Sequence, residues 1–260
     1  MTDIRVYSLD GVRNFRDFGN YPSRFGGHVQ AGRLFRSGHY AEATDDDLAE
    51  ISALDIHVQV DLRRPDERER LPGKWTATRV ISHDDGRETQ APHEWFLKRV
   101  EGGAEAAEAW MTDYYRAAPF KKHHTDMFGE WFTALGTLPS GSAALVNCAA
   151  GKDRTGILCA LTHHVLGVSP EDIRADYKLT NQAADVATRL PIAAAFYNDM
   201  LGKDHPEDVY RPFLGVRLAF LKAAIDSIND QAGSVDDYLT DVLGVDEPAR
   251  DKIRDGLLTG

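Results

Sequence analysis

Cys148 and Arg154, separated by five residues, are the pair of side chains in this sequence best suited to chemistry. An apolar run from Ala143 to Val146 precedes the pair, and a helical pattern from Thr155 to Leu166 follows it. This order predicts a strand, a tight loop and the N-terminus of a helix. Because the amide groups of such a loop and of the first helical turn converge on one point, the segment is expected to bind an anion.

Small residues make up the first half of this loop. Ala149, Ala150 and Gly151 let the main chain close around a tetrahedral oxyanion, and Gly151 can take a positive φ angle without a steric penalty. Arg154 can bind two phosphate oxygens through parallel charge-assisted hydrogen bonds. The amides, the helix dipole and the guanidinium all favour the thiolate form of Cys148, which would be a nucleophile aimed at phosphorus.

The run Cys-x5-Arg-Thr-Gly from Cys148 to Gly156 resembles the signature of the cysteine-dependent protein tyrosine phosphatases. The complete string is similar to the bacterial and fungal branch of tyrosine and dual-specificity phosphatases, which includes secreted mycobacterial tyrosine and lipid phosphatases. One residue departs from the pattern, because Asn147 precedes the cysteine where a phosphatase usually has histidine. Further landmarks of that branch occur in the expected order along almost the whole chain: Asn14-Phe-Arg-Asp17, Leu34-Phe-Arg-Ser-Gly38, Asp61-Leu-Arg63 with Glu67, and Gly233 to Leu239 followed by Leu243-Gly244.

The resemblance implies a phosphomonoester hydrolase that forms a phosphocysteine intermediate and acts on phosphotyrosine. Its partner would be a phosphorylated protein or a small phosphomonoester, and inorganic phosphate or a similar oxyanion would bind in the site. No cofactor and no metal are implied, so EDTA is expected to leave the activity intact. The phosphate-binding segment would comprise Ala149, Ala150, Gly151, Lys152, Asp153 and Arg154, supported by Asn147, Thr155 and Arg63.

The chain offers more than one carboxyl group as the general acid. Asp153 lies inside the loop, and in the related phosphatases the aspartate at this place is taken as the acid. Asp61 is the second candidate, since it ends a predicted strand whose carboxyl end faces the same crevice. Asp84 and Asp85, in a loop after another short strand, are a third choice. Thr155 is expected to hydrogen-bond the thiolate and ease its departure.

Other functions are compatible with these residues. Lys152 adds a cation beside the scissile phosphate, as in phosphatases of inositol phosphates, so a dual-specificity or phosphoinositide phosphatase is the nearest alternative. Asn147 supports a catalytically weak phosphate-binding pseudophosphatase. A sulfur- or arsenate-handling enzyme uses a comparable loop but does not account for the Lys-Asp-Arg-Thr-Gly ending. A Walker A loop is excluded, because Asp153 replaces the hydroxyl residue that would bind Mg²⁺.

The composition fits one globular domain, residues 1–260. Hydrophobic residues make up 42% of the chain and charged residues 27%, and no repeat or linker divides it. The net charge of −11 disfavours nucleic acid and anionic membrane surfaces as partners. The chain has no run of about 18 apolar residues, so no integral membrane segment is expected. The first residues lack a signal-peptide pattern, which favours a cytoplasmic location and is also compatible with secretion without a signal.

The elements expected to position the loop form an α/β fold, a small, largely parallel sheet flanked by helices with a helix-rich C-terminal part. Alternating apolar residues predict a strand from Ile56 to Leu62, and a short helix capped by Thr44 precedes it. An amphipathic pattern from Met127 to Leu135 predicts a core helix. The second cysteine, Cys159, is expected to be a small core residue rather than a partner of Cys148.

The C-terminal third is predicted to be helical. Ser169-Pro170 opens a helix whose Tyr177 and Asn181 are placed near the site by the resemblance. The stretch from Thr188 to His205 mixes apolar residues with Gly202 and is interpreted as pieces of helix. By analogy, a helical pair in this general region forms a lid in a mycobacterial relative. Pro212 is expected to begin a long helix.

Overall fold

A five-stranded sheet lies at the centre of the computed structural model, which describes residues 6–85, 97 and 102–260. The strand order is β1-β2-β5-β3-β4. β1 runs antiparallel to β2 and the other neighbours are parallel, which confirms the predicted small, largely parallel sheet. The strands are β1 (Arg16–Asp17), β2 (Leu34–Ser37), β3 (Ile56–Asp61), β4 (Arg79–Ile81) and β5 (Ala143–Asn147).

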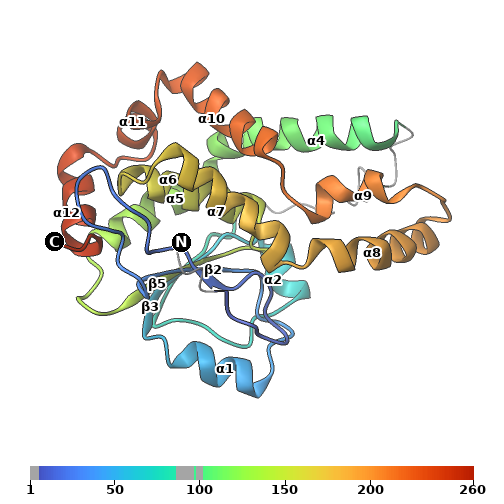
Figure 1. Cartoon of the computed structure of the whole chain (residues 1–260), viewed down its shortest axis with the longest axis horizontal. Helices are drawn as coiled ribbons and strands as arrows, with labels where there is room; N and C mark the ends of the chain where they lie inside the picture. Colours follow the sequence, from blue (N-terminus) through green and yellow to red (C-terminus); the bar gives the residue numbers. More distant parts are fainter. Residues whose placement is uncertain (1–5, 86–96, 98–101) are drawn as a thin grey trace.

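Helices surround the sheet and dominate the second half of the chain (Figure 1). A short 3₁₀ turn (Ala118–Phe120) follows α4, and a π-helical turn (Tyr238–Val242) follows α11. The α-helices are α1 (Asp45–Ser52), α2 (Pro65–Arg70), α4 (Gly103–Ala117), α5 (Lys122–Leu135), α6 (Asp153–Val165), α7 (Pro170–Ala183), α8 (Val186–Leu201), α9 (Glu207–Leu214), α10 (Leu218–Ala232), α11 (Val235–Asp237) and α12 (Glu247–Leu257).

Helices cover both faces of the sheet (Figure 1), and each face has its own apolar core. α1 covers one face, where Ile51 packs in a cluster with Phe35 of β2 and Leu145 of β5. α5 and α6 cover the other face, and Trp131 of α5 shares the larger core with Val146 of β5. Successive residues of β5 therefore enter the two cores in turn, as the period of a strand requires. Since β5 is held from both sides, the position of the residue that follows it is fixed.

Most of the predicted boundaries agree with the structure to within two residues. Thr44 caps α1 through a capping box with Asp47, and β3 ends one residue before the predicted Leu62. α6 begins at Asp153, two residues earlier than expected, so its first turn belongs to the loop. Cys159 is a buried core residue, and burial raises the pKa of its thiol to about 12. Cys159 therefore stays protonated at neutral pH.

The boundary at Pro212 was predicted wrongly, because this proline lies inside α9 and the long helix α10 begins at Leu218. A proline in the last turn of a short helix removes only one helical hydrogen bond. The break comes instead at Gly215, whose backbone is extended. The side chain of Asn181 then binds the next residue, accepting from the amide of Val216 at 2.8 Å and donating to its carbonyl at 3.0 Å.

α8 and α9 pack against each other and form a small third core with Leu97 (Figure 1). α8 is one helix from Val186 to Leu201, where separate pieces were expected, and it ends at Gly202, which takes a positive φ of 61°. Among the described helices, none combines the length and the apolar character that crossing a bilayer demands.

Candidate active site

Cys148 follows the last residue of β5 and lines a cavity of about 520 Å³, with only 2% of its own surface exposed. Gly151 gives the next loop its shape, because its φ angle is 65°. A Cβ atom at this position would lie 2.3 Å from the backbone of Ser37, so a side chain cannot be accommodated there. The backbone amides of residues 149–152 have no hydrogen-bond acceptor among the described residues.

The carbonyl groups of the loop are bound from behind. Asn14 donates to the carbonyl oxygens of Gly151 at 2.6 Å and Ala150 at 3.4 Å, and Arg36 donates to that of Gly151 at 3.0 Å. Asn14 in turn accepts a hydrogen bond from Arg16. With the carbonyl groups engaged, the amide groups of the loop are the ones available to an anion in the cavity.

A buried ion cluster lies behind the loop. Asp176 of α7 accepts hydrogen bonds from Arg36 at 2.9 Å and from Arg16 at 3.4 Å, and all three side chains are almost fully buried. Burial alone would raise the pKa of Asp176, but the two guanidinium groups outweigh burial and lower it. The cluster holds two positive charges and one negative charge. Its excess positive charge favours an anion at the loop.

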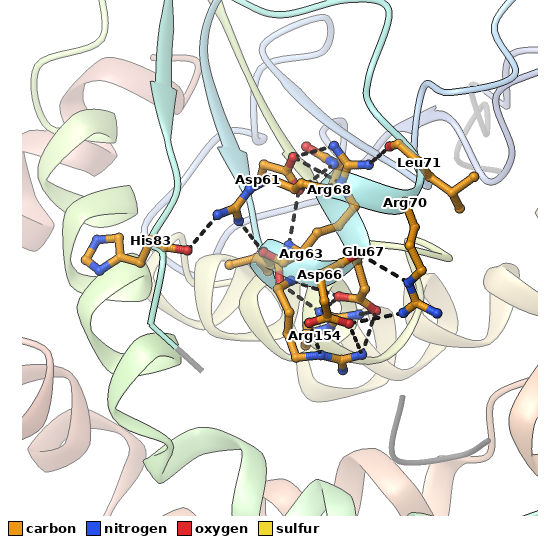
Figure 2. A network of polar contacts seen from close by, with 12 residues as sticks. Asp61, Arg63, Asp66, Glu67, Arg68, Arg70, Leu71, His83 and Arg154 are labelled. Carbon is orange, nitrogen blue, oxygen red and sulfur yellow. Dashed lines mark hydrogen bonds and ion pairs between the residues drawn. The ribbon is translucent and has the colours of Figure 1, made fainter. Parts of the chain in front are cut away.

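Arg154 is fixed at the edge of the cavity by Glu67 (Figure 2). Its Nη1 and Nη2 lie 2.6 Å and 2.9 Å from the two carboxylate oxygens, and Nη1 also donates to the carbonyl of Leu62 at 2.9 Å. Burial alone would raise the pKa of Glu67, but the charge of Arg154 lowers it to about 2. A guanidinium has five N–H groups. The described residues engage three, and the Nε–H and one Nη2–H can bind two oxygens of a phosphoryl group.

Asp61 is saturated with hydrogen bonds inside the protein. It accepts from the backbone N, Nε and Nη2 of Arg63, at 2.7 to 3.1 Å, and from Nδ2 of Asn147 at 3.1 Å (Figure 2). Arg63 lines the cavity and Asp61 does not. The amide oxygen of Asn147 accepts from Gln59 at 2.8 Å, so this side chain bridges two residues of β3. This geometry does not favour Asp61 as the general acid.

Asp153 has the access that Asp61 lacks. Its side chain lines the cavity with about 20% of its surface exposed, and its Oδ1 accepts a hydrogen bond from the hydroxyl of Tyr115 at 2.7 Å. Tyr115 accepts in turn from the hydroxyl of Tyr177 at 2.7 Å. Burial raises the pKa of both tyrosines well above their ordinary value, so they are neutral donors. This chain of hydrogen bonds orients the Asp153 carboxyl group in the cavity that Cys148 also lines.

Lys152 is not a free cation in the cavity. Its Nζ donates to the carbonyl oxygens of Pro212 at 3.1 Å and Gly215 at 2.9 Å, and it lies 3.3 Å from Asp153. These carbonyl groups stand at the C-terminal end of α9, the end that attracts positive charge. Lys152 therefore links the loop to α9, and its charge is shared with these oxygens rather than directed at a bound phosphate.

The remaining predicted residues fall into two groups. Thr155 is fully buried, and its hydroxyl has no hydrogen-bond partner in the described part of the chain, which leaves it available to the sulfur of Cys148. Asp84 pairs with Arg68 at 2.8 Å, and neither Asp84 nor Asp85 lines the cavity. The third choice of general acid therefore lies outside the site.

Several residues that shape the site have no role assigned to them by the sequence patterns. Tyr115, which orients Asp153, carries no local signal because it lies on α4, far from the loop in sequence. In the sequence, Glu67 was noted only as one of the landmarks shared with the phosphatase family. Its position three residues after Arg64 is typical of the start of a helix. The apolar and aromatic lining includes Trp110, Met111, Tyr114, Tyr197, Phe213 and Leu214, and the charged lining includes Arg13, His39, Glu42, Arg64, Arg70 and Arg189.

Comparison with known proteins gives a consistent result. Residues 7–259 match the model of a family described as the tyrosine phosphatase family. A putative tyrosine-protein phosphatase of Cupriavidus necator is 32% identical over 246 residues, which cover 92% of this chain and 84% of that protein. The triple specificity protein phosphatase PtpB of Mycobacterium tuberculosis is 29% identical over 292 residues, covering 99% of this chain and all of PtpB.

Proposed function

This chain belongs to the tyrosine phosphatase family, and we propose that it hydrolyses phosphotyrosine through a phosphocysteine intermediate formed on Cys148. The proposal depends on the position of Cys148. The amides of the loop that follows it have no acceptor among the described residues, and those residues leave two N–H groups of Arg154 available. The match over residues 7–259 supports a single phosphatase domain.

In the first step the thiolate of Cys148 attacks phosphorus. A sulfur–phosphorus bond forms as the bond from phosphorus to the phenolic oxygen breaks. Asp153 donates its proton to that oxygen, so tyrosine leaves as a neutral phenol. Arg154 and the loop amides bind the three equatorial oxygens throughout, and this preorganised charge is the largest catalytic contribution we expect.

In the second step water attacks the phosphocysteine. The carboxylate of Asp153 now accepts a proton from the water, and the sulfur–phosphorus bond breaks to release inorganic phosphate. The thiolate of Cys148 departs, and the buried hydroxyl of Thr155 stabilises it. The enzyme returns to its starting state without a metal or a cofactor, because the loop and Arg154 supply the positive charge.

The walls of the cavity favour an aromatic phosphomonoester. Met111, Tyr114 and Phe213 give an apolar surface against which the ring of phosphotyrosine can pack. Dual specificity is the second candidate, because the relative from Mycobacterium tuberculosis is named a triple specificity phosphatase. Relative kcat/KM values for matched phosphotyrosine, phosphoserine and phosphoinositide substrates decide between the two.

The two cysteines of the chain provide a matched test of the nucleophile. We expect wild type and Cys159→Ala to hydrolyse p-nitrophenyl phosphate and Cys148→Ala to be inactive, since only Cys148 lines the cavity. Mass spectrometry of a rapidly quenched reaction should place the phosphoryl group on Cys148. An inactive wild-type protein that still binds phosphate would instead establish a pseudophosphatase, and activity in Cys148→Ala would overturn the mechanism.

A further inference from the structure

Two arginines of the cavity have no part in the reaction described above. Arg13 directly precedes Asn14, which binds the phosphate loop, and Arg189 lies on the first turns of α8. Both line the cavity that contains Cys148. Arg189 is partly buried, and its guanidinium forms no hydrogen bond or ion pair with any residue that the structure describes.

The immediate surroundings leave these two positive charges poorly balanced. Burial lowers the pKa of Arg189, and the charge of Arg13 lowers it further, against a smaller opposite effect of Glu42 and Asp185. Glu42 pairs with Arg13 only loosely, at 3.6 Å, and both of their side chains are about half exposed. A partly buried cation that feels the charge of a second cation is stabilised when an anion binds near both.

Both arginines are attached to the phosphate loop through short paths. The carbonyl of Arg13 accepts a hydrogen bond from the amide of Gly38 at 2.8 Å, and the neighbouring His39 donates its amide to Ala149 of the loop. On the other side, the first turn of α8 packs close to Gly215, whose carbonyl binds Lys152 of the loop. The backbones of both arginines are therefore anchored close to the loop that follows Cys148.

We propose that Arg13 and Arg189 form a second anion subsite that binds a carboxylate or a phosphate next to the phosphotyrosine of a peptide. This inference rests on the proposed function, because the scissile phosphate must occupy the loop of Cys148. A peptide is favoured over a lipid headgroup, since a chain of net charge −11 is repelled by an anionic membrane surface. Arg189 of α8 would then contribute to the choice of substrate.

The test compares three phosphotyrosine peptides that differ only in the residues beside the phosphotyrosine: neutral, acidic, or carrying a phosphoserine. The kcat/KM of each is measured for wild type, Arg189→Gln, the double variant Arg13→Gln/Arg189→Gln, and Arg189→Glu. Arg174→Gln is the control, because Arg174 is an exposed arginine on α7 outside the cavity and its loss changes the net charge equally.

Wild type and Arg174→Gln should prefer either anionic peptide over the neutral one by about tenfold, as one charge-assisted hydrogen bond provides. This ratio should fall several-fold in Arg189→Gln, approach one in the double variant and invert in Arg189→Glu. Equal kcat/KM for the three peptides in wild type, or an unchanged ratio in the double variant, would overturn the subsite. So would a soluble inositol phosphate that outperforms both anionic peptides only when the arginines are present. Failure of wild type to hydrolyse any peptide would count against the proposed function instead.

Discussion

The ion pair between Glu67 and Arg154 can be tested with Glu67→Gln. The amide has nearly the size of the carboxylate, but it is uncharged and turns a donor group toward the guanidinium. Arg154 would lose one of its contacts at 2.6 Å and 2.9 Å, and a buried cation would be left without its counter-ion. Removing one partner of a buried pair is far more damaging than removing an exposed one.

The pKa of Glu67 gives the size of the effect. It falls from an ordinary value of 4.5 to about 2 in the folded protein, although burial alone would raise it. At about 1.36 kcal/mol per pKa unit, this change corresponds to about 3 kcal/mol of folding stability. Because the folded pKa is the lower one, this stability is fully present above the unfolded pKa and is lost as the pH falls toward 2.

Glu67→Gln should therefore lower the free energy of unfolding at pH 7 by about 3 kcal/mol, and Tm by about 6–12 °C for a chain of this length. We also expect kcat/KM to fall by about 10²-fold, because a displaced guanidinium no longer meets the phosphoryl oxygens. Urea unfolding at several pH values, together with steady-state kinetics at pH 7, measures both effects. Asp113→Asn is the control, and it should cost less than about 1 kcal/mol, since Asp113 and its partner Arg116 are both solvent-exposed.

The pH dependence separates this explanation from a general loss of packing. If the carboxylate charge is responsible, the stability gap between wild type and Glu67→Gln narrows as the pH is lowered below about 4.5. A gap that stays constant down to pH 3 would refute the electrostatic argument. Equal unfolding free energies at pH 7 would refute the ion pair itself.

Three further predictions concern the loop and its surroundings. Tyr115→Phe removes the hydroxyl that orients Asp153, so kcat for phenyl phosphate should fall about tenfold and the pH–rate profile should shift, with a smaller effect on p-nitrophenyl phosphate, whose leaving group needs less protonation. Gly151→Ala places a Cβ atom 2.3 Å from the backbone of Ser37 at a positive φ, and its kcat/KM should fall at least about 10²-fold, whereas wild-type values would show that the loop rearranges freely. EDTA should leave kcat unchanged, and loss of activity that Zn²⁺ or Mg²⁺ restores would contradict the two-step mechanism.

The local features of the site could be predicted from the sequence because they depend on neighbouring residues. The small residues of the loop, the strand before Cys148 and the helix after it are each determined by a few consecutive side chains. The N-cap at Thr44 and the helix start at Ser169-Pro170 are equally local, and both were predicted correctly. The predicted start of α10 at Pro212 was wrong, because a proline is compatible with the last turn of one helix as well as with the first turn of the next.

The contacts that tune the site could not be predicted, because they join residues far apart in the chain. Tyr115 reaches Asp153 from α4, and Glu67 reaches Arg154 from α2. No periodicity or spacing links such pairs, since their meeting depends on how helices pack on the sheet. Lys152 illustrates the same limit, because its place in the loop suggests a free cation while the end of α9 binds its ammonium group.

Burial reconciles an acidic chain with a site for an anion. The net charge of −11 describes the whole chain, whereas Arg16, Arg36 and Asp176 lie together behind the loop with one positive charge in excess. Because buried charges are screened far less than exposed ones, this local excess governs the loop more strongly than the distant surface carboxylates do. Arg16 also donates a hydrogen bond to Asn14, and Arg36 donates one to Gly151, so the residues that supply the charge also support the loop.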